Sequence, residues 1–272
     1  MRRLRQPARE SSWGCPRCGH EAVGMIERIA TVPGTPLLIP GIASGAADEL
    51  GDVRRAALGR VAWAAGDSGR ITVLAQDPSA SAMTRALLPD RVSLAPLGLD
   101  SDVSAAGGRS RGAYGDARAA TDGDDADALP VSVLVAAYLA STAGVVIDEL
   151  WSMPSDPTRV GVPPVITAGA GIVLIADGSS TRTPKAPGSF VEGALEFDDA
   201  LVASVASIDR EFLTDSRRAL DADRFGVQGL GVWAAAAHLT GDLAGEWVGE
   251  VDLSTDPYGV CYLVAGWTAT RP

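Results

Sequence analysis

The sequence predicts a single α/β domain with a mostly parallel central sheet flanked by helices. Short apolar runs such as Ile71–Ala75, which are typical of strands buried on both faces, alternate with amphipathic helical segments. Hydrophobic residues make up 46% of the 272 residues and aromatic residues only 5%, which favours a core of close-packed aliphatic side chains. Residues 25–272 show neither an internal repeat nor a second hydrophobic core, so we expect one domain.

The first predicted unit is a strand, a helix and a second strand, which implies a parallel pair. The first strand covers residues 26–32 and ends at Pro33-Gly34. We expect Ser44 to cap a helix that runs to about Ala65, because apolar residues recur there at three- and four-residue spacing. The second strand is the buried run at 71–75.

The remaining elements are predicted from the same signals. Residues 98–128 are rich in Gly, Ser, Arg and Asp, and we expect an acidic surface loop rather than a metal site, because no apolar residues fix the carboxylates. The last strand is expected to be central in the sheet, because it is long and rich in β-forming residues. The elements expected after the loop are a helix at 129–141, strands at 145–150 and 171–176, helices at 196–208, 209–222 and 228–240, and a strand at 258–265.

Composition restricts the partners and the compartment. The net charge of −11 repels phosphate backbones and anionic lipid, so we expect neither nucleic acid nor a membrane surface as partner. The apolar segment 131–147 is short for a membrane span and contains polar residues, which favours a buried helix followed by a strand. Three cysteines do not form a disulfide framework, and the basic N-terminus is followed by no apolar stretch, so we expect a cytoplasmic protein.

Residues 1–24 differ in composition from the rest of the chain. They contain five arginines without apolar periodicity, and we interpret them as a flexible basic tail or as an over-extended gene start with Met25 as the natural initiator. The CxxC pair Cys15 and Cys18, followed by His20, has the spacing of half a zinc knuckle. A structural zinc ion needs four ligands, and the only other cysteine, Cys261, lies in a predicted core strand. Cys15, Cys18 and His20 are therefore candidate zinc ligands from an incomplete set.

Two further kinds of site are considered and not favoured. Asp177-Gly178-Ser179-Ser180 follows a predicted strand, but a G-x-S-x-G motif is absent, so a serine hydrolase lacks its signature. The only histidine within the domain, His238, is expected to be partly buried near a helix C-terminus. Gly169-Ala-Gly171 precedes its strand and Gly229-Leu-Gly231 follows none, which argues against a nucleotide cofactor.

Three segments together resemble a known family. Residues 31–40 (TVPGTPLLIP) and the helix after them are similar to the opening of the catalytic B subunit of class III extradiol ring-cleavage dioxygenases, the LigB-like superfamily. Residues 175–188 (IADGSSTRTPKAPG), with Phe197-Asp-Asp, resemble the G-D-G-S loop of a short bacterial branch of that family, and 257–265 (PYGVCYLVA) resemble its closing strand. The resemblance covers about 25–267 and implies an α/β sheet flanked by helices.

The resemblance also implies a metal site that this chain does not reproduce. The family holds Fe(II) with two histidines and a glutamate, and a further histidine acts as acid–base. The loops where the first two histidines are expected read Pro33-Gly34-Thr35-Pro36 and Gln76-Asp77-Pro78, and Ser180 stands at the acid–base position. Glu246 or Glu250 matches the carboxylate ligand, and Asp77 could replace a histidine. Such a ligand set is nearly all oxygen, which suits harder ions than an oxygen-activating iron.

We therefore expect a LigB-like protein with a degenerate metal site that binds a small polar or aromatic molecule at the carboxyl ends of its strands. The alternative is an active Fe(II)-type aromatic ring-opening dioxygenase that uses non-standard ligands or a partner subunit; a purely structural or interaction protein is a third class. Lys185 and Arg182 are expected to hold an anion. The expected pocket residues are Thr35, Asp77, Asp177, Ser179, Ser180 and Lys185, and the candidate metal ligands within the domain are Asp77 and Glu246.

Overall fold

The computed structural model describes residues 26–42, 49–86, 88–104, 129–163, 166–167, 169–243 and 245–270. Its strands are β1 (Arg28–Val32), β2 (Arg70–Gln76), β3 (Thr84–Ala86), β4 (Arg91–Ser93), β5 (Asp102–Ser104), β6 (Val146–Met153), β7 (Gly171–Ile175), β8 (Glu246–Thr255) and β9 (Tyr262–Thr270). Seven of them form one sheet in the order β3-β6-β2-β7-β1-β9-β8, and β4 pairs with β5 separately. The four neighbours β6, β2, β7 and β1 are parallel, and β3, β9 and β8 are antiparallel to their neighbours. The predicted single α/β domain with a mostly parallel sheet is confirmed.

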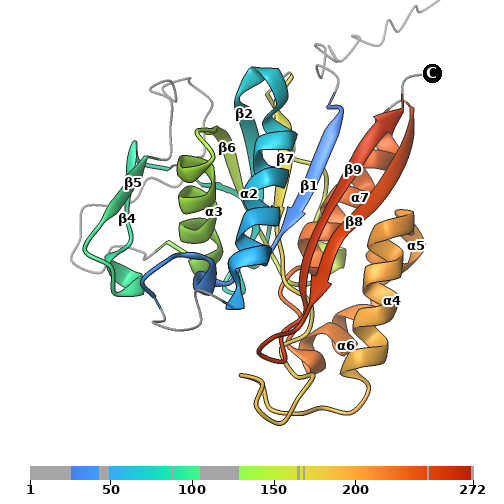
Figure 1. Cartoon of the computed structure of the whole chain (residues 1–272). Helices are drawn as coiled ribbons and strands as arrows, with labels where there is room; N and C mark the ends of the chain where they lie inside the picture. Colours follow the sequence, from blue (N-terminus) through green and yellow to red (C-terminus); the bar gives the residue numbers. More distant parts are fainter. Residues whose placement is uncertain are drawn as a thin grey trace, which may run out of the picture.

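Two layers of helices cover the sheet (Figure 1). The helices are α2 (Gly51–Ala65), α3 (Val131–Thr142), α4 (Ala194–Ser207), α5 (Arg210–Thr214), α6 (Arg217–Phe225) and α7 (Leu230–Asp242), with short 3-10 turns at Pro36–Leu38, Gly66–Ser68, Ala95–Leu97 and Pro157–Arg159. The buried side chains of α2 and α3 form one hydrophobic cluster, and those of α4 to α7 form a second. Neighbouring residues of β7 enter different clusters, since Val173 belongs to the first and Leu174 to the second. The sequence did not predict this second hydrophobic cluster, which lies on the opposite face of the same sheet.

Helix α2 packs closely on the sheet because of the residues at its interface. Its buried residues include Val53, Ala57, Val61 and Ala64, at the predicted helical spacing. A Cβ atom on Gly171 of β7 would lie 1.9 Å from the carbonyl oxygen of Ala64, so this approach requires glycine. The predicted cap Ser44 lies outside the described residues. Among the described residues, no helix combines the length and apolarity needed to cross a membrane.

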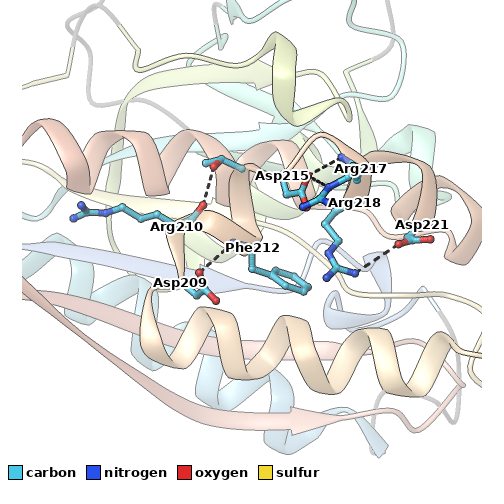
Figure 2. A network of polar contacts seen from close by, with 8 residues as sticks. Asp209, Arg210, Phe212, Asp215, Arg217, Arg218 and Asp221 are labelled. Carbon is cyan, nitrogen blue, oxygen red and sulfur yellow. Dashed lines mark hydrogen bonds and ion pairs between the residues drawn. The ribbon is translucent and has the colours of Figure 1, made fainter.

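The predicted helix at 209–222 is wrong in one respect, because the structure divides it into α5 and α6. Asp209 caps α5 by accepting a hydrogen bond from the Phe212 amide at 3.1 Å. Asp215, between the two helices, accepts one from the Arg217 amide at 2.9 Å (Figure 2). Aspartate side chains that bond nearby backbone amides interrupt a helix and favour a new start. The guanidinium of Arg218 lies 4.7 Å from the Phe212 ring centroid and spans the junction.

Several strands differ from the prediction. β8 was not predicted, and it forms the edge of the sheet with regularly alternating exposed and half-buried residues. β9 begins at Tyr262 rather than at 258, and it lies second from the edge, between β1 and β8. β3, β4 and β5 were also missed, and β5 falls at the start of the expected loop. Residues 105–128 of that loop, like residues 1–25 with the candidate zinc ligands Cys15, Cys18 and His20, lie outside the described residues.

The connections after β1 and β7 create an opening at the carboxyl ends of these two strands. After β1 the chain passes to α2 on one face, whereas after β7 it passes to α4 on the other face. β1 and β7 are parallel neighbours, with Val32 beside Ile175 at their carboxyl ends. Loops that leave adjacent parallel strands toward opposite faces diverge, and the crevice between them is the usual ligand position in open α/β sheets.

Candidate functional site

A cavity of about 690 Å³ lies at the carboxyl ends of β1, β2 and β7. It is lined by residues from the loops after these strands, by the start of α3, by the turn between α6 and α7, and by the start of β9. The sequence predicts a pocket at this end of the strands. The residues that line it are 34–37, 76–79, 130–132, 175, 177, 178, 180, 187, 226, 228, 258, 260 and 262.

The segment after β7 is held from both sides by backbone hydrogen bonds. Asp177 and Gln228 exchange two such bonds, of 2.6 and 2.9 Å. On the other side, the amide of Gly178 donates to the carbonyl of Cys261 at 2.9 Å, and the amide of Cys261 donates to Ser179 at 2.8 Å. The segment thus continues the sheet for a few residues. This rigid position fixes where the Asp177 side chain lies.

Asp177 is a buried carboxyl group of the cavity, since only 6% of the residue is exposed. Its Oδ2 accepts a hydrogen bond from the Gly34 amide at 3.1 Å, while Oδ1 is buried and has no partner among the described residues. Burial raises the pKa of this carboxyl to about 7, and the bond from Gly34 opposes part of that rise. Buried polar groups are normally satisfied, so a half-satisfied buried carboxyl in a cavity is a strong candidate for a functional group.

Hydroxyl and amide groups line the cavity together with Asp177. Burial raises the pKa of Tyr262 to about 12; a hydrogen bond with Thr35 opposes this rise, and the charge of Asp177 adds to it. Nε2 of Gln76 donates to Ser155 Oγ at 2.9 Å, and its Oε1 is buried without a partner in the described part of the chain. The cavity therefore combines two carboxyl groups, those of Asp77 and Asp177, with neutral polar groups.

The structure brings some of the predicted pocket residues together and separates others. Thr35, Asp77, Asp177 and Ser180 line the cavity. Ser179 does not, because it is fully buried and both its amide and its hydroxyl donate to Asp198 on α4.

The two predicted anion-binding cations also lie outside the cavity lining. Lys185 is exposed to solvent. The guanidinium of Arg182 forms ion pairs of 3.4 Å with both Asp198 and Asp256. The expected anion site at Lys185 and Arg182 is therefore not found at this cavity.

The candidate ligands for iron do not meet at the cavity. Glu246 pairs with Thr270 at the far end of β8, whereas Thr255, at the other end of β8, pairs with Tyr262 beside the cavity. Oδ1 of Asp77 accepts hydrogen bonds from the amide and the hydroxyl of Ser79, at 2.9 and 2.6 Å.

Glu250 and His238 also lie outside the cavity lining. Glu250 is exposed and bonds Arg60 at 2.8 Å. His238 is exposed on α7 rather than partly buried as expected. Within the described ranges, no group of three or more His, Cys, Asp and Glu residues could hold a metal ion. The donors present do not fit an Fe(II) site of two histidines and a carboxylate.

The sequence pattern does not predict that tyrosines line the cavity. Tyr258 and Tyr262 were assigned only to a strand, but they lie where the antiparallel β9 begins. β9 runs antiparallel to β1, so β9 begins beside the carboxyl end of β1. The first residues of β9 therefore lie at the same end of the sheet as the loops after β1 and β7. Gln228 was missed because it reaches the cavity through its pairing with Asp177, a long-range contact without a local sequence signal.

Comparison with models of known protein families finds no match for this chain, and comparison with curated proteins finds no similar sequence. The class of the protein is therefore defined by its fold and cavity. It is an α/β protein with a cavity at the topological switch point between β1 and β7, and that cavity contains a buried, half-satisfied carboxyl group.

Proposed function

We propose that this chain binds a small molecule in the cavity at the carboxyl ends of its parallel strands. The observation that carries the proposal is Asp177, which lines the cavity while its buried Oδ1 lacks a partner among the described residues. A buried acceptor without a donor costs about 1–3 kcal/mol, and more when it is charged. A ligand that donates a hydrogen bond to Oδ1 would recover that cost. The cavity volume of about 690 Å³ also lies within the usual range for small-molecule sites.

We further propose that the protein is a LigB-like relative whose ring-cleavage chemistry has been lost. The similarity of 31–40, 175–188 and 257–265 to that family supports a shared fold, and all three segments supply residues of the cavity. Against iron chemistry stands the donor set, since Asp77 and Asp177 are the carboxylates of the cavity lining and no histidine joins them in the described residues. We place the protein in the cytoplasm, because the described cysteine, Cys261, is buried and unpaired.

A pair of matched substitutions tests the proposal. Val131 lines the cavity at the start of α3 and is 45% exposed, whereas Val248 is 56% exposed on β8, away from the cavity. Val131→Trp should fill part of the cavity, and Val248→Trp places the same side chain elsewhere. Small molecules bearing hydroxyl, amine or carboxylate groups are screened against the wild-type protein by ligand-observed NMR. We expect bound molecules to lose their signal with Val131→Trp and to keep it with Val248→Trp.

Two results would count against the proposed function. One is a screen in which no molecule binds the wild-type protein. The other is a set of bound molecules that remain bound to Val131→Trp, because binding would then occur elsewhere on the surface. Thermal unfolding of both variants checks that each remains folded.

A further inference from the structure

We propose that the ligand of this cavity is a small organic cation, such as a primary amine or an amidine. This inference rests on the proposed function and adds the charge of the ligand to it. The geometry that points to it is an apolar cavity with two carboxylates, Asp77 and Asp177, and no lysine, arginine or histidine among the described residues that line it.

The partner that Asp177 lacks is a donor, and a charged donor suits it best. An ionised carboxylate forms its shortest and strongest hydrogen bonds with cationic donors such as ammonium and amidinium groups. A neutral donor would satisfy Oδ1 but would leave a charge buried in a site of low dielectric constant. A cation satisfies the bond and also compensates the charge, which matters most for a carboxylate that is only 6% exposed.

Other features of the cavity favour an organic cation over a bare metal ion. The side chains of Leu37, Val131, Ile175 and Val260 give the lining an apolar part, which suits carbon groups. Tyr258 and Tyr262 lie on the same cavity, and aromatic rings attract organic cations. The volume of about 690 Å³ is far larger than one ion needs. The net charge of −11 of the whole chain also favours the approach of cations.

The cations nearest in sequence cannot compensate Asp177 in place of a ligand. Arg182 is engaged by Asp198 and Asp256, and Lys185 is exposed outside the cavity lining. The titratable groups that interact with Asp177 are Tyr262 and Cys261, whose pKa values burial raises to about 12, and Tyr258 and Asp77 line the same cavity. None of these groups supplies a positive charge at neutral pH.

Three probes of similar shape and different charge separate the possibilities: benzylamine, benzyl alcohol and benzoate. Calorimetry should show that benzylamine binds the wild-type protein most tightly and that benzoate does not bind. Asp177→Asn should weaken benzylamine roughly ten- to hundredfold, the loss expected for one hydrogen bond to a charged group. Asp100→Asn, which removes the same charge from an exposed position outside the cavity, should leave the affinity unchanged.

The pH dependence gives a second readout. Because the pKa of Asp177 is about 7, the affinity for benzylamine should fall as the pH drops below 7, by up to roughly tenfold per pH unit. Benzyl alcohol should show no such dependence, since it does not require an ionised carboxylate.

The outcomes distinguish this inference from the function on which it rests. If benzyl alcohol or benzoate binds as tightly as benzylamine, and Val131→Trp abolishes that binding, the cavity binds small molecules but the inferred charge is wrong. If Asp177→Asn and Asp100→Asn bind benzylamine equally well, Asp177 is not the anchor and the inference also fails. If none of the three probes binds at millimolar concentration, the inference is overturned, whereas the proposed function fails only if the broader screen also finds no bound molecule.

Discussion

Two buried aspartates, Asp177 and Asp198, differ in whether both of their carboxylate oxygens have hydrogen-bond partners. Burial raises the pKa of both Asp177 and Asp198. Asp198 accepts hydrogen bonds from the amide and the hydroxyl of Ser179 and pairs with Arg182. Asp177 accepts only the Gly34 amide, and its second oxygen has no partner within the described part of the chain. Burial alone therefore does not distinguish the two carboxylates; the unsatisfied oxygen of Asp177 does, and the proposed function rests on it.

The same contrast separates the residues of the D-G-S run at 177–179. Asp177 lines the cavity, whereas Ser179 binds Asp198 and so ties the loop to α4. A Cβ atom on Gly178 would lie 2.7 Å from Cys261 Cβ and 2.9 Å from Asp198 Oδ1, so this position has no room for a side chain. Ser179 ties the loop to α4 and Gly178 allows its close packing, whereas Asp177 presents a carboxyl group at the cavity.

The largest effect is expected at the structural aspartate. Asp198→Ala leaves Arg182 and the Ser179 donors without their buried partner, and we expect a loss of about 3–5 kcal/mol in the free energy of unfolding. Urea denaturation measures this loss. The matched control is Asp199→Ala, because Asp199 is the exposed neighbour on the same helix, and its substitution should change stability by less than about 0.5 kcal/mol. Equal effects of the two variants would remove the distinction between Asp198 and an ordinary surface aspartate.

Substitution of the cavity aspartate, Asp177, is expected to increase the free energy of unfolding rather than to decrease it. The folded pKa of Asp177, about 7, lies above the ordinary 3.8, so the folded state binds this proton more tightly than the unfolded state does. Its contribution to stability is then complete below about pH 4 and is lost as the pH rises through 7. The loss corresponds to at most roughly 4 kcal/mol. Asp177→Asn removes the charge, so it should be more stable than the wild-type protein at about pH 8.

The measurement for Asp177→Asn is the difference in unfolding free energy between variant and wild type across the pH range. This difference should be near zero at about pH 4, should grow between pH 4 and 7 and should stay constant above it. Parallel pH profiles of the two proteins would show that the Asp177 carboxyl is solvated like an ordinary one. A stabilising substitution that abolishes ligand binding would support a role in function rather than in folding.

The sequence predicted the parts of the fold that depend on local pattern. β2 and β7 are continuous apolar runs, and such runs are strong signals for buried parallel strands. β8 was missed although Trp247, Val251 and Leu253 are spaced as in a strand, because Gly249 and the exposed Val248 interrupt the alternation of apolar and polar residues. That glycine lies against α4, where a Cβ atom would be 2.4 Å from the carbonyl oxygen of Ala206, and no local signal predicts this contact.

The candidate site could be predicted only where it depends on strand ends. Thr35, Asp77 and Asp177 follow parallel strands, so their place at the cavity edge follows from topology. The sequence does not show which of the adjacent Ser179 and Ser180 faces the cavity, since that depends on the packing of α4 and of Gly226. Tyr262 and Gln228 reach the site through pairings distant in sequence, which residue patterns do not encode.

The smallest effect is expected at Lys185, the residue that the sequence placed in the pocket and the structure places in solvent. Lys185→Ala removes a positive charge from the 177–198 stretch without touching the cavity, Asp177 or Asp198. The unfolding free energy should change by less than about 0.5 kcal/mol. The affinity for benzylamine should not fall, because repulsion between two cations can only decrease. A clear loss of benzoate or phosphate binding with Lys185→Ala, measured by calorimetry, would instead restore the anion-binding interpretation of this loop.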